Sequence, residues 1–222
     1  LDDENDDLDI EEWISRIINI DYFIGSFMKF DVKGLFYVDE YGYPCRKYLD
    51  ITKKNVDCSS PELMVIMMNP GSSTPKDGLD NGCTLTETIP DPTQFQIMNI
   101  MENTGINFSR ILNLSDLRNP SSSKFYSMIK NNRKDTKHCI FDDSRKEDLD
   151  ALFIKGLPTI FAWGVDSTLK TLADLAVKKL EIAKPLGVLK GGSQYYHARP
   201  HLKSEQEIWI STILKQMSIK DF

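Results

Sequence analysis

The chain has 222 residues, a formal net charge of −6 and 41% hydrophobic residues. This length and apolar content suit one domain with a sizeable core, or one domain with a small appendage. The acidic balance supplies no overall attraction for nucleic acid, so binding DNA or RNA would need a local basic face.

The positions of cysteine and histidine and the hydropathy pattern further restrict the class of protein. The cysteines are widely scattered, at positions 45, 58, 83 and 139, and the 3 histidines are dispersed as well. Zinc sites use close ligand pairs, so we predict no metal and no cofactor. No apolar run is long enough to cross a membrane, and the first residues are acidic where a signal peptide is basic. We expect a cytoplasmic protein with reduced thiols and no membrane partner.

The first predicted elements are a helix and a hairpin. Apolar residues recur at helical spacing from Ile10 to Ile18, after an acidic lead. Residues 34–51 then alternate apolar and polar side chains around a central turn, which is typical of a β-hairpin. We expect the hairpin to form an edge of the core or a lid on it.

An apolar run from Leu63 to Met68 then stops at Asn69-Pro70-Gly71. Six apolar residues predict a strand that is covered on both faces, and Pro-Gly cannot continue it. Ligands bind at the carboxyl ends of strands in open α/β sheets, so Asn69 is presented where a site is expected. A long polar loop over 71–92 follows, and it leads into a helix over 94–103.

Three further strands are predicted over 109–114, 157–164 and 185–189, each followed by a polar or aromatic segment. Residues 131–146 have little periodicity and predict a surface loop. Helices are predicted over 145–155, 167–179 and 205–217.

The alternation of strands and helices predicts an α/β fold, a three-layer αβα sandwich with a mostly parallel four-stranded central sheet. Residues 1–60 would be an N-terminal helix and hairpin packed on a core formed by 61–222, within a single domain overall. There is no Walker sequence and no glycine-rich phosphate fingerprint, so nucleoside triphosphate hydrolysis has no support.

Four short motifs now stand at successive strand ends. They are Asn69-Pro70-Gly71, Asn113, Trp163-Gly164, and the loop from His197 through Arg199 to His201-Leu202. Their order and chemistry resemble the uracil-DNA glycosylase superfamily, and the resemblance covers residues 63–204.

A second resemblance spans most of the chain. The segments 63–72, 91–93, 113–118 and 162–164 are similar to the core motifs of the domain-of-unknown-function-1643 family, which is found in bacteria and phages. Two departures are the insertion of Gly71 before the serines and the altered His201-Leu202. Membership supplies a name more than a function.

The glycosylase resemblance implies a role for each motif. Asn69 would position a hydrolytic water or the sugar, and Asn113 would read the edge of a flipped base. His197 would contact the developing anionic base or a phosphate. Aspartates of the 71–92 loop, Asp91 among them, could replace the carboxylate that is missing from the first motif. The remaining implied ligand contacts are Pro70, Gly71, Ser72, Phe95, Arg118, Trp163, Arg199, His201 and Leu202.

Each role has a structural alternative. The two asparagines could satisfy loop backbone groups, and Asp91 could cap the next helix. Phe95 and Trp163 suit core packing. Arg118 could pair with Asp116 at little gain in stability.

Three functions are therefore open. The first is binding a nucleobase or nucleic acid with hydrolysis of an N-glycosidic bond. The second is a non-catalytic module on the same fold that binds a nucleotide-like ligand or a protein. The third is another small-molecule enzyme with an asparagine-lined pocket. The oligomeric state is not predicted.

Overall fold

The structure is a computed structural model, and it describes residues 29–132 and 135–219. The helix expected between Ile10 and Ile18 lies outside the described residues.

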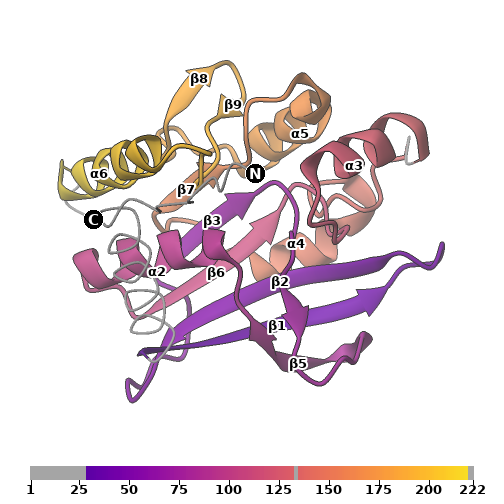
Figure 1. The fold of residues 1–222 in the computed structure, drawn as a ribbon, viewed down its shortest axis with the longest axis horizontal. Coiled ribbons are helices and arrows are strands. Elements are labelled where there is room, and N and C mark those ends of the chain that lie inside the picture. Colours follow the sequence, from indigo (N-terminus) through magenta and orange to yellow (C-terminus); the bar gives the residue numbers. More distant parts are fainter. Residues whose placement is uncertain (1–28, 133–134, 220–222) are drawn as a thin grey trace, which may run out of the picture.

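A seven-stranded sheet forms the centre of the described chain (Figure 1). Its order is β4-β5-β1-β2-β6-β3-β7. The strands are β1 (Phe30–Val38), β2 (Pro44–Lys53), β3 (Leu63–Met67), β4 (Thr74–Pro75), β5 (Asn81–Ile89), β6 (Phe108–Asn113) and β7 (Thr159–Ala162).

The expected mostly parallel four-stranded sheet is wrong. Only β3 pairs parallel, with β6 on one side and β7 on the other, and all other adjacent strands of this sheet, β2 and β6 included, pair antiparallel. The reason is the hairpin of β1 and β2, which joins the sheet because β2 pairs with β6 at Leu49↔Ile111. Leu49 and Ile51 are fully buried. The hairpin is thus an interior part of the sheet and is neither its edge nor a lid.

The polar loop expected over 71–92 is also wrong for most of its length. It contains β4 and β5, which close the antiparallel end of the sheet. Most β5 side chains are exposed, and only Thr86 and Thr88 are buried. A strand with mostly exposed side chains has no hydrophobic run, so its sequence looks like a loop.

The expected fourth strand over 185–189 is reduced to one parallel bridge, Ile160↔Leu186. The chain leaves the sheet at Gly187, where φ is +151° and an added Cβ would lie 2.7 Å from the Phe161 carbonyl oxygen. Beyond it, β8 (Leu189–Gly191) and β9 (Gln194–Tyr195) form a separate two-stranded ribbon.

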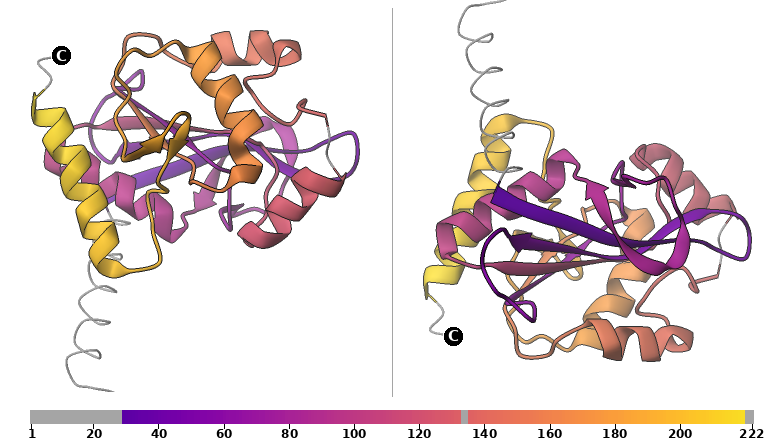
Figure 2. Two further views of the ribbon diagram at one scale, coloured as in Figure 1. Left: turned by 90° about the horizontal axis from the view of Figure 1, so that it is seen from above. Right: turned by 90° about the horizontal axis from the view of Figure 1, so that it is seen from below.

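Helices cover both faces of the sheet (Figure 2). On one face, called here the α2 face, α2 (Pro92–Thr104) and α6 (Lys203–Ile219) bury Ile97, Met101 and Trp209 against the strands. The opposite face carries α3 (Ser122–Ser127), α4 (Lys146–Leu152) and α5 (Lys170–Leu180). Short turns of helix extend these at Met128–Asn132, Asp143–Arg145 and Ser167–Leu169.

The surface loop expected over 131–146 is wrong in its middle. Cys139, Ile140 and Phe141 are fully buried in the core of the α4 and α5 face. Three adjacent apolar residues show no period, and the charges around them mask their burial. No helix in the described ranges is long and apolar enough to cross a membrane.

Candidate functional site

Asn69 lies directly beyond the end of β3. Its side-chain nitrogen Nδ2 donates hydrogen bonds to the carbonyl oxygens of Leu117 at 3.2 Å and Asn119 at 3.0 Å. The amide therefore ties the end of β3 to the loop that follows β6, as the structural alternative expected. A catalytic role for Asn69 stays a prediction.

Asp91 connects this strand end to α2. Its Oδ1 accepts hydrogen bonds from the backbone nitrogens of Thr93 at 2.9 Å and Gln94 at 3.2 Å, so it caps the helix in a capping box. Its Oδ2 faces Gly71, because an added Cβ on Gly71 would lie 3.0 Å from that oxygen. Pro70 is buried beside them, and Ser72 is exposed. The cap thus places one carboxylate oxygen at the end of β3.

Asn113 ends β6 and pairs with Met67 of β3. Its neighbours Leu112 and Leu114 point into the core of the α4 and α5 face, so the alternation of the strand directs Asn113 to the α2 face. The side chain is fully buried, and neither Nδ2 nor Oδ1 has a hydrogen-bond partner within the described chain. Buried amides are nearly always paired, so this one is an exception that needs an explanation.

Arg46 is a second such exception, and the sequence analysis did not single it out. It is 2% exposed, and its Nε and Nη1 have no hydrogen-bond partner among the described residues. Arg46 pairs with Phe36 across β1 and β2, and the Arg118 guanidinium carbon lies 5.2 Å from the centre of that Phe36 ring. Burial lowers the pKa of Arg46 to about 10, although the charge of Asp91 acts in the opposite direction.

His197 approaches the same region from the loop after β9. Its Nδ1 lies 3.1 Å from the backbone nitrogen of Arg199, which donates to it. Burial lowers the pKa of His197 below its usual value, and the Asp91 carboxylate opposes that change. Asp91 therefore interacts electrostatically with both Arg46 and His197. Arg199, His201 and Leu202, which the resemblance also implied, are exposed.

These four residues, Arg46, Asp91, Asn113 and His197, are called the strand-end cluster below. The charge of Asp91 affects the pKa of both Arg46 and His197, and the pairing of β2 with β6 places Arg46 and Asn113 toward the same end of the sheet. The cluster thus contains a guanidinium, a carboxylate, an amide and an imidazole. Such a set can bind a polar ligand and transfer a proton. Arg46 lies in a segment whose alternation predicts a strand, and this was the only indication in the sequence. The sequence does not distinguish a buried arginine from one that reaches solvent.

Arg118 lies next to this cluster with a different partner from the one expected. It forms an ion pair with Asp80 of the segment before β5, with Nη1 2.6 Å from Oδ1. The alternative pairing with Asp116 does not form, because Asp116 pairs with Arg145 instead, and ligand contact by Arg118 stays a prediction.

Phe95 and Trp163 have the packing role. Phe95 is partly buried against the core of the α2 face. Trp163 is fully buried, its Nε1 donates to the Ser193 carbonyl oxygen at 2.9 Å, and its ring centre lies 4.6 Å from that of Phe161. Ligand contact by either ring stays a prediction.

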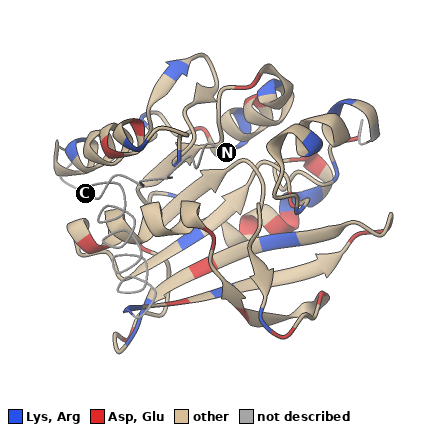
Figure 3. Cartoon of the chain, viewed as in Figure 1, with Lys and Arg blue, Asp and Glu red and all other residues tan. Residues whose placement is uncertain are grey.

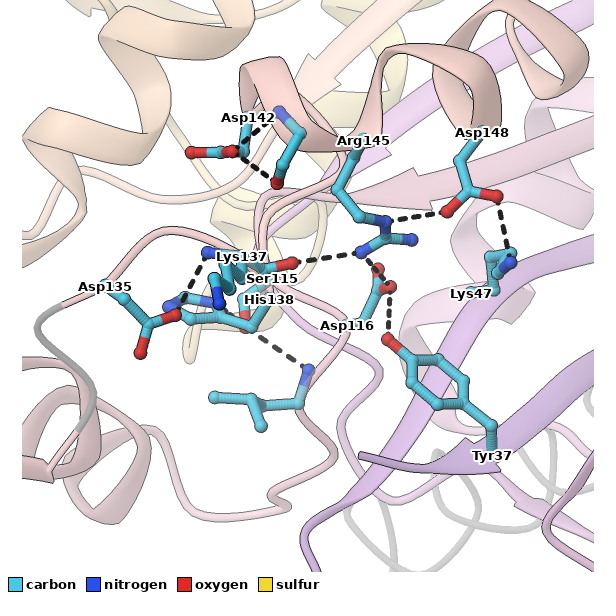
Figure 4. A network of polar contacts seen from close by, with 12 residues as sticks. Tyr37, Lys47, Ser115, Asp116, Asp135, Lys137, His138, Asp142, Arg145 and Asp148 are labelled. Carbon is cyan, nitrogen blue, oxygen red and sulfur yellow. Dashed lines mark hydrogen bonds and ion pairs between the residues drawn. The ribbon is translucent and has the colours of Figure 1, made fainter. Parts of the chain in front are cut away.

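A second polar network surrounds Asp116 in the loop after β6 (Figure 4). Asp116 Oδ2 accepts hydrogen bonds from the Tyr37 hydroxyl at 2.8 Å and from Arg145 Nη1 at 2.9 Å. Arg145 Nε also binds Asp148, which in turn binds Lys47. Burial raises the pKa of Asp116 to about 6, against the attraction of Arg145. Burial, with the charge of Asp116, also raises the pKa of Tyr37, so Tyr37 remains a donor.

This network holds the loop between β6 and α3, which Asn69 also binds. His138 Nδ1 lies 2.8 Å from Ser115 Oγ, which accepts from the Leu117 backbone nitrogen at 3.2 Å. A cavity of about 420 Å³ opens beside it and is lined in part by Tyr37, Cys45, Lys47, His138, Arg145 and Asp148. This network could not be predicted from the sequence, because its residues come from distant segments of the chain.

Apart from Arg46 and Arg118, the positive charges of the described chain are distributed over its elements (Figure 3). Lys and Arg are spread over several elements and interspersed with Asp and Glu (Figure 3). Within the described ranges, no group of three or more His, Cys, Asp or Glu side chains could hold a metal ion.

The fold and the strand-end cluster define a mixed α/β protein with buried and half-buried polar groups near one end of its central sheet. The family described as "Protein of unknown function (DUF1643)" matches residues 51–197, about two thirds of the chain. The chain therefore belongs to the DUF1643 family. Searches of curated proteins and of solved structures gave no match.

Proposed function

We propose that this protein binds a nucleobase-bearing ligand at the strand-end cluster and hydrolyses its N-glycosidic bond. The observation that carries the proposal is Asn113, a fully buried amide with both its donor and its acceptor free of protein partners in the described chain. An amide in this state matches the paired donor and acceptor on the edge of a base. The order of the strand-end motifs, which resembles the uracil-DNA glycosylase superfamily, supports the same proposal.

Asp91 and His197 would supply the chemistry. A water molecule attacks the anomeric carbon of the sugar, and Asp91 Oδ2 accepts a proton from that water. The carbon–nitrogen bond breaks, and the base leaves with the bonding electron pair. His197 would donate a hydrogen bond to the negative charge that develops on the base, because its lowered pKa favours the neutral ring, whose remaining proton can point at the ligand.

Access to Asn113 requires a movement, because its side chain is sealed from solvent. The loop from His197 to His201 and the turn at Gly71 border the cluster. Both contain exposed residues, so we propose that one of them opens to admit the ligand and closes before hydrolysis.

The test is a base-release assay, read by chromatography, on nucleosides, nucleoside monophosphates and single-stranded oligonucleotides. We expect wild-type protein to release free base from at least one class of compound. Asn113→Ala should lower the rate by about a hundredfold, the scale of losing one well-placed transition-state hydrogen bond. Asn103→Ala, on the exposed face at the far end of α2, is the matched control and should leave the rate unchanged.

Two results would contradict the proposal. Absence of base release from every class, with binding retained, would favour the non-catalytic nucleotide-binding module. Release at an unchanged rate in Asn113→Ala would move the base away from the strand ends.

A further inference from the structure

Arg46 is a buried charge with no direct counter-ion in the part of the chain that the structure describes, and a bound ligand of opposite charge would supply one. Arginine is almost never fully buried unless it is paired, because removing a charge from water is costly. Arg46 is 2% exposed, and two of its three side-chain nitrogens have no partner among the described residues.

Each of the two carboxylates that influence Arg46 electrostatically has one oxygen bound to other groups. Asp91 uses Oδ1 to cap α2, and Asp116 uses Oδ2 to bind Tyr37 and Arg145. Neither forms a hydrogen bond or an ion pair with Arg46. The guanidinium is therefore a positive charge that the described part of the protein leaves without a direct counter-ion.

We propose that Arg46 binds a phosphoryl group of the ligand, so that the substrate class is a free nucleoside monophosphate. The nucleobase half of this assignment rests on the proposed function, whereas the phosphate half rests on Arg46 alone. Asn113 would then bind the base and Arg46 the phosphate. Both residues lie at the same end of neighbouring strands, because Leu49, three residues after Arg46, pairs with Ile111, two residues before Asn113.

A free nucleotide fits this position better than a nucleic-acid strand. A terminal phosphate can be enclosed on all sides, whereas a backbone phosphodiester must continue into solvent in two directions. A strand would also need a row of exposed cations. Lys and Arg are instead interspersed with acidic residues over the surface, and the chain has a net charge of −6 (Figure 3).

The test compares ligands that differ only in the phosphate. Calorimetry would measure binding of each nucleoside, its 5′-monophosphate and a short single-stranded oligonucleotide to the full chain. Inorganic phosphate would be tested separately through its effect on Tm. We expect the monophosphates to bind about tenfold to a hundredfold tighter than the nucleosides, the scale of a charge-assisted hydrogen bond. Inorganic phosphate should raise the Tm.

Arg46→Met keeps a similar length and removes the charge. We expect it to abolish both the phosphate preference and the Tm rise, while its own Tm without ligand increases because an uncompensated charge is gone. Arg46→Lys should retain part of the preference. Lys178→Met, at an exposed cation of α5 on the opposite face of the sheet, is the control and should keep the preference.

Equal affinity for nucleosides and monophosphates would overturn this inference and leave the proposed base binding standing. A preference that survives in Arg46→Met, or disappears in Lys178→Met, would also overturn it. Tighter binding of the oligonucleotide would overturn the assignment to a free nucleotide. Phosphate binding that depends on Arg46, without any base release, would support the inference and contradict only the proposed hydrolysis.

Discussion

At the scale of single residues, Asn113, Arg46 and Asp116 share one property. Each is buried and has at least one side-chain nitrogen or oxygen without a hydrogen-bond partner in the described chain. Such a group costs about 1–3 kcal/mol of stability, and more when it is charged. Three of them around the end of β6 lower the stability of this region and support the ligand site proposed above.

Asp116 provides a prediction that depends on pH. Its carboxyl keeps its proton to a pH of about 6 in the folded protein, against a usual pKa of 3.8. Between these values the folded state binds more protons than the unfolded state, so the free energy of unfolding falls as pH rises. The fall from this group is roughly 3 kcal/mol at most.

Asp116→Asn removes this titration. We expect the free energy of unfolding of the variant, relative to that of wild type, to rise as pH rises from 4 to 6.5, measured by urea unfolding at a series of pH values. A relative stability that stays constant or falls over that range would contradict the raised pKa of Asp116.

At the scale of elements, the antiparallel junction of β2 and β6 is the feature that shapes the sheet. Asp50 and Arg110 face each other across it, with Nε 2.7 Å from Oδ1 and Nη2 2.8 Å from Oδ2. The Arg110 guanidinium also lies over the Tyr48 ring at 4.8 Å. This two-bond pairing fixes the register of the hairpin against the parallel strands.

Arg110→Met should therefore weaken the junction. It leaves the Asp50 carboxylate 9% exposed and unpaired, so we expect a loss of about 3 kcal/mol in the free energy of unfolding, the low end for breaking a buried pair. Urea unfolding measures this loss. The double variant Asp50→Leu with Arg110→Met removes both charges and should lose less. A double variant that loses as much as the sum of both single variants would show that the pair adds nothing.

The same junction marks the limit of prediction from the sequence. The strands at Leu63–Met67, Phe108–Asn113 and Thr159–Ala162 and the helix capped by Asp91 were located correctly, because buried runs and caps are local signals. The strand that pairs with the hairpin was not predicted, because alternation of apolar and polar residues indicates a strand but does not indicate which strand lies next to it. The polar strand β5 gave no hydrophobic signal.

At the scale of the whole molecule, β1 and β2 lie between β5 and β6 in one continuous sheet. We therefore propose that the hairpin and the remaining described residues fold as one domain. In the candidate site too, residues with a local sequence signal were predicted, and a residue whose role depends on distant contacts was not. Asn113 and Asp91 were found because they stand at strand and helix ends, whereas Arg46 became visible only when the fold enclosed it.

The most direct test of the strand-end cluster is the side-chain amide signal of Asn113 in a ¹⁵N-correlated NMR spectrum. The signal is assigned by its loss in Asn113→Asp and followed during titration with nucleoside monophosphates. We predict that it shifts to a new position at saturation, while the amide of Asn103 stays in place. An Asn113 signal that does not move while the protein binds the nucleotide would contradict the central claim.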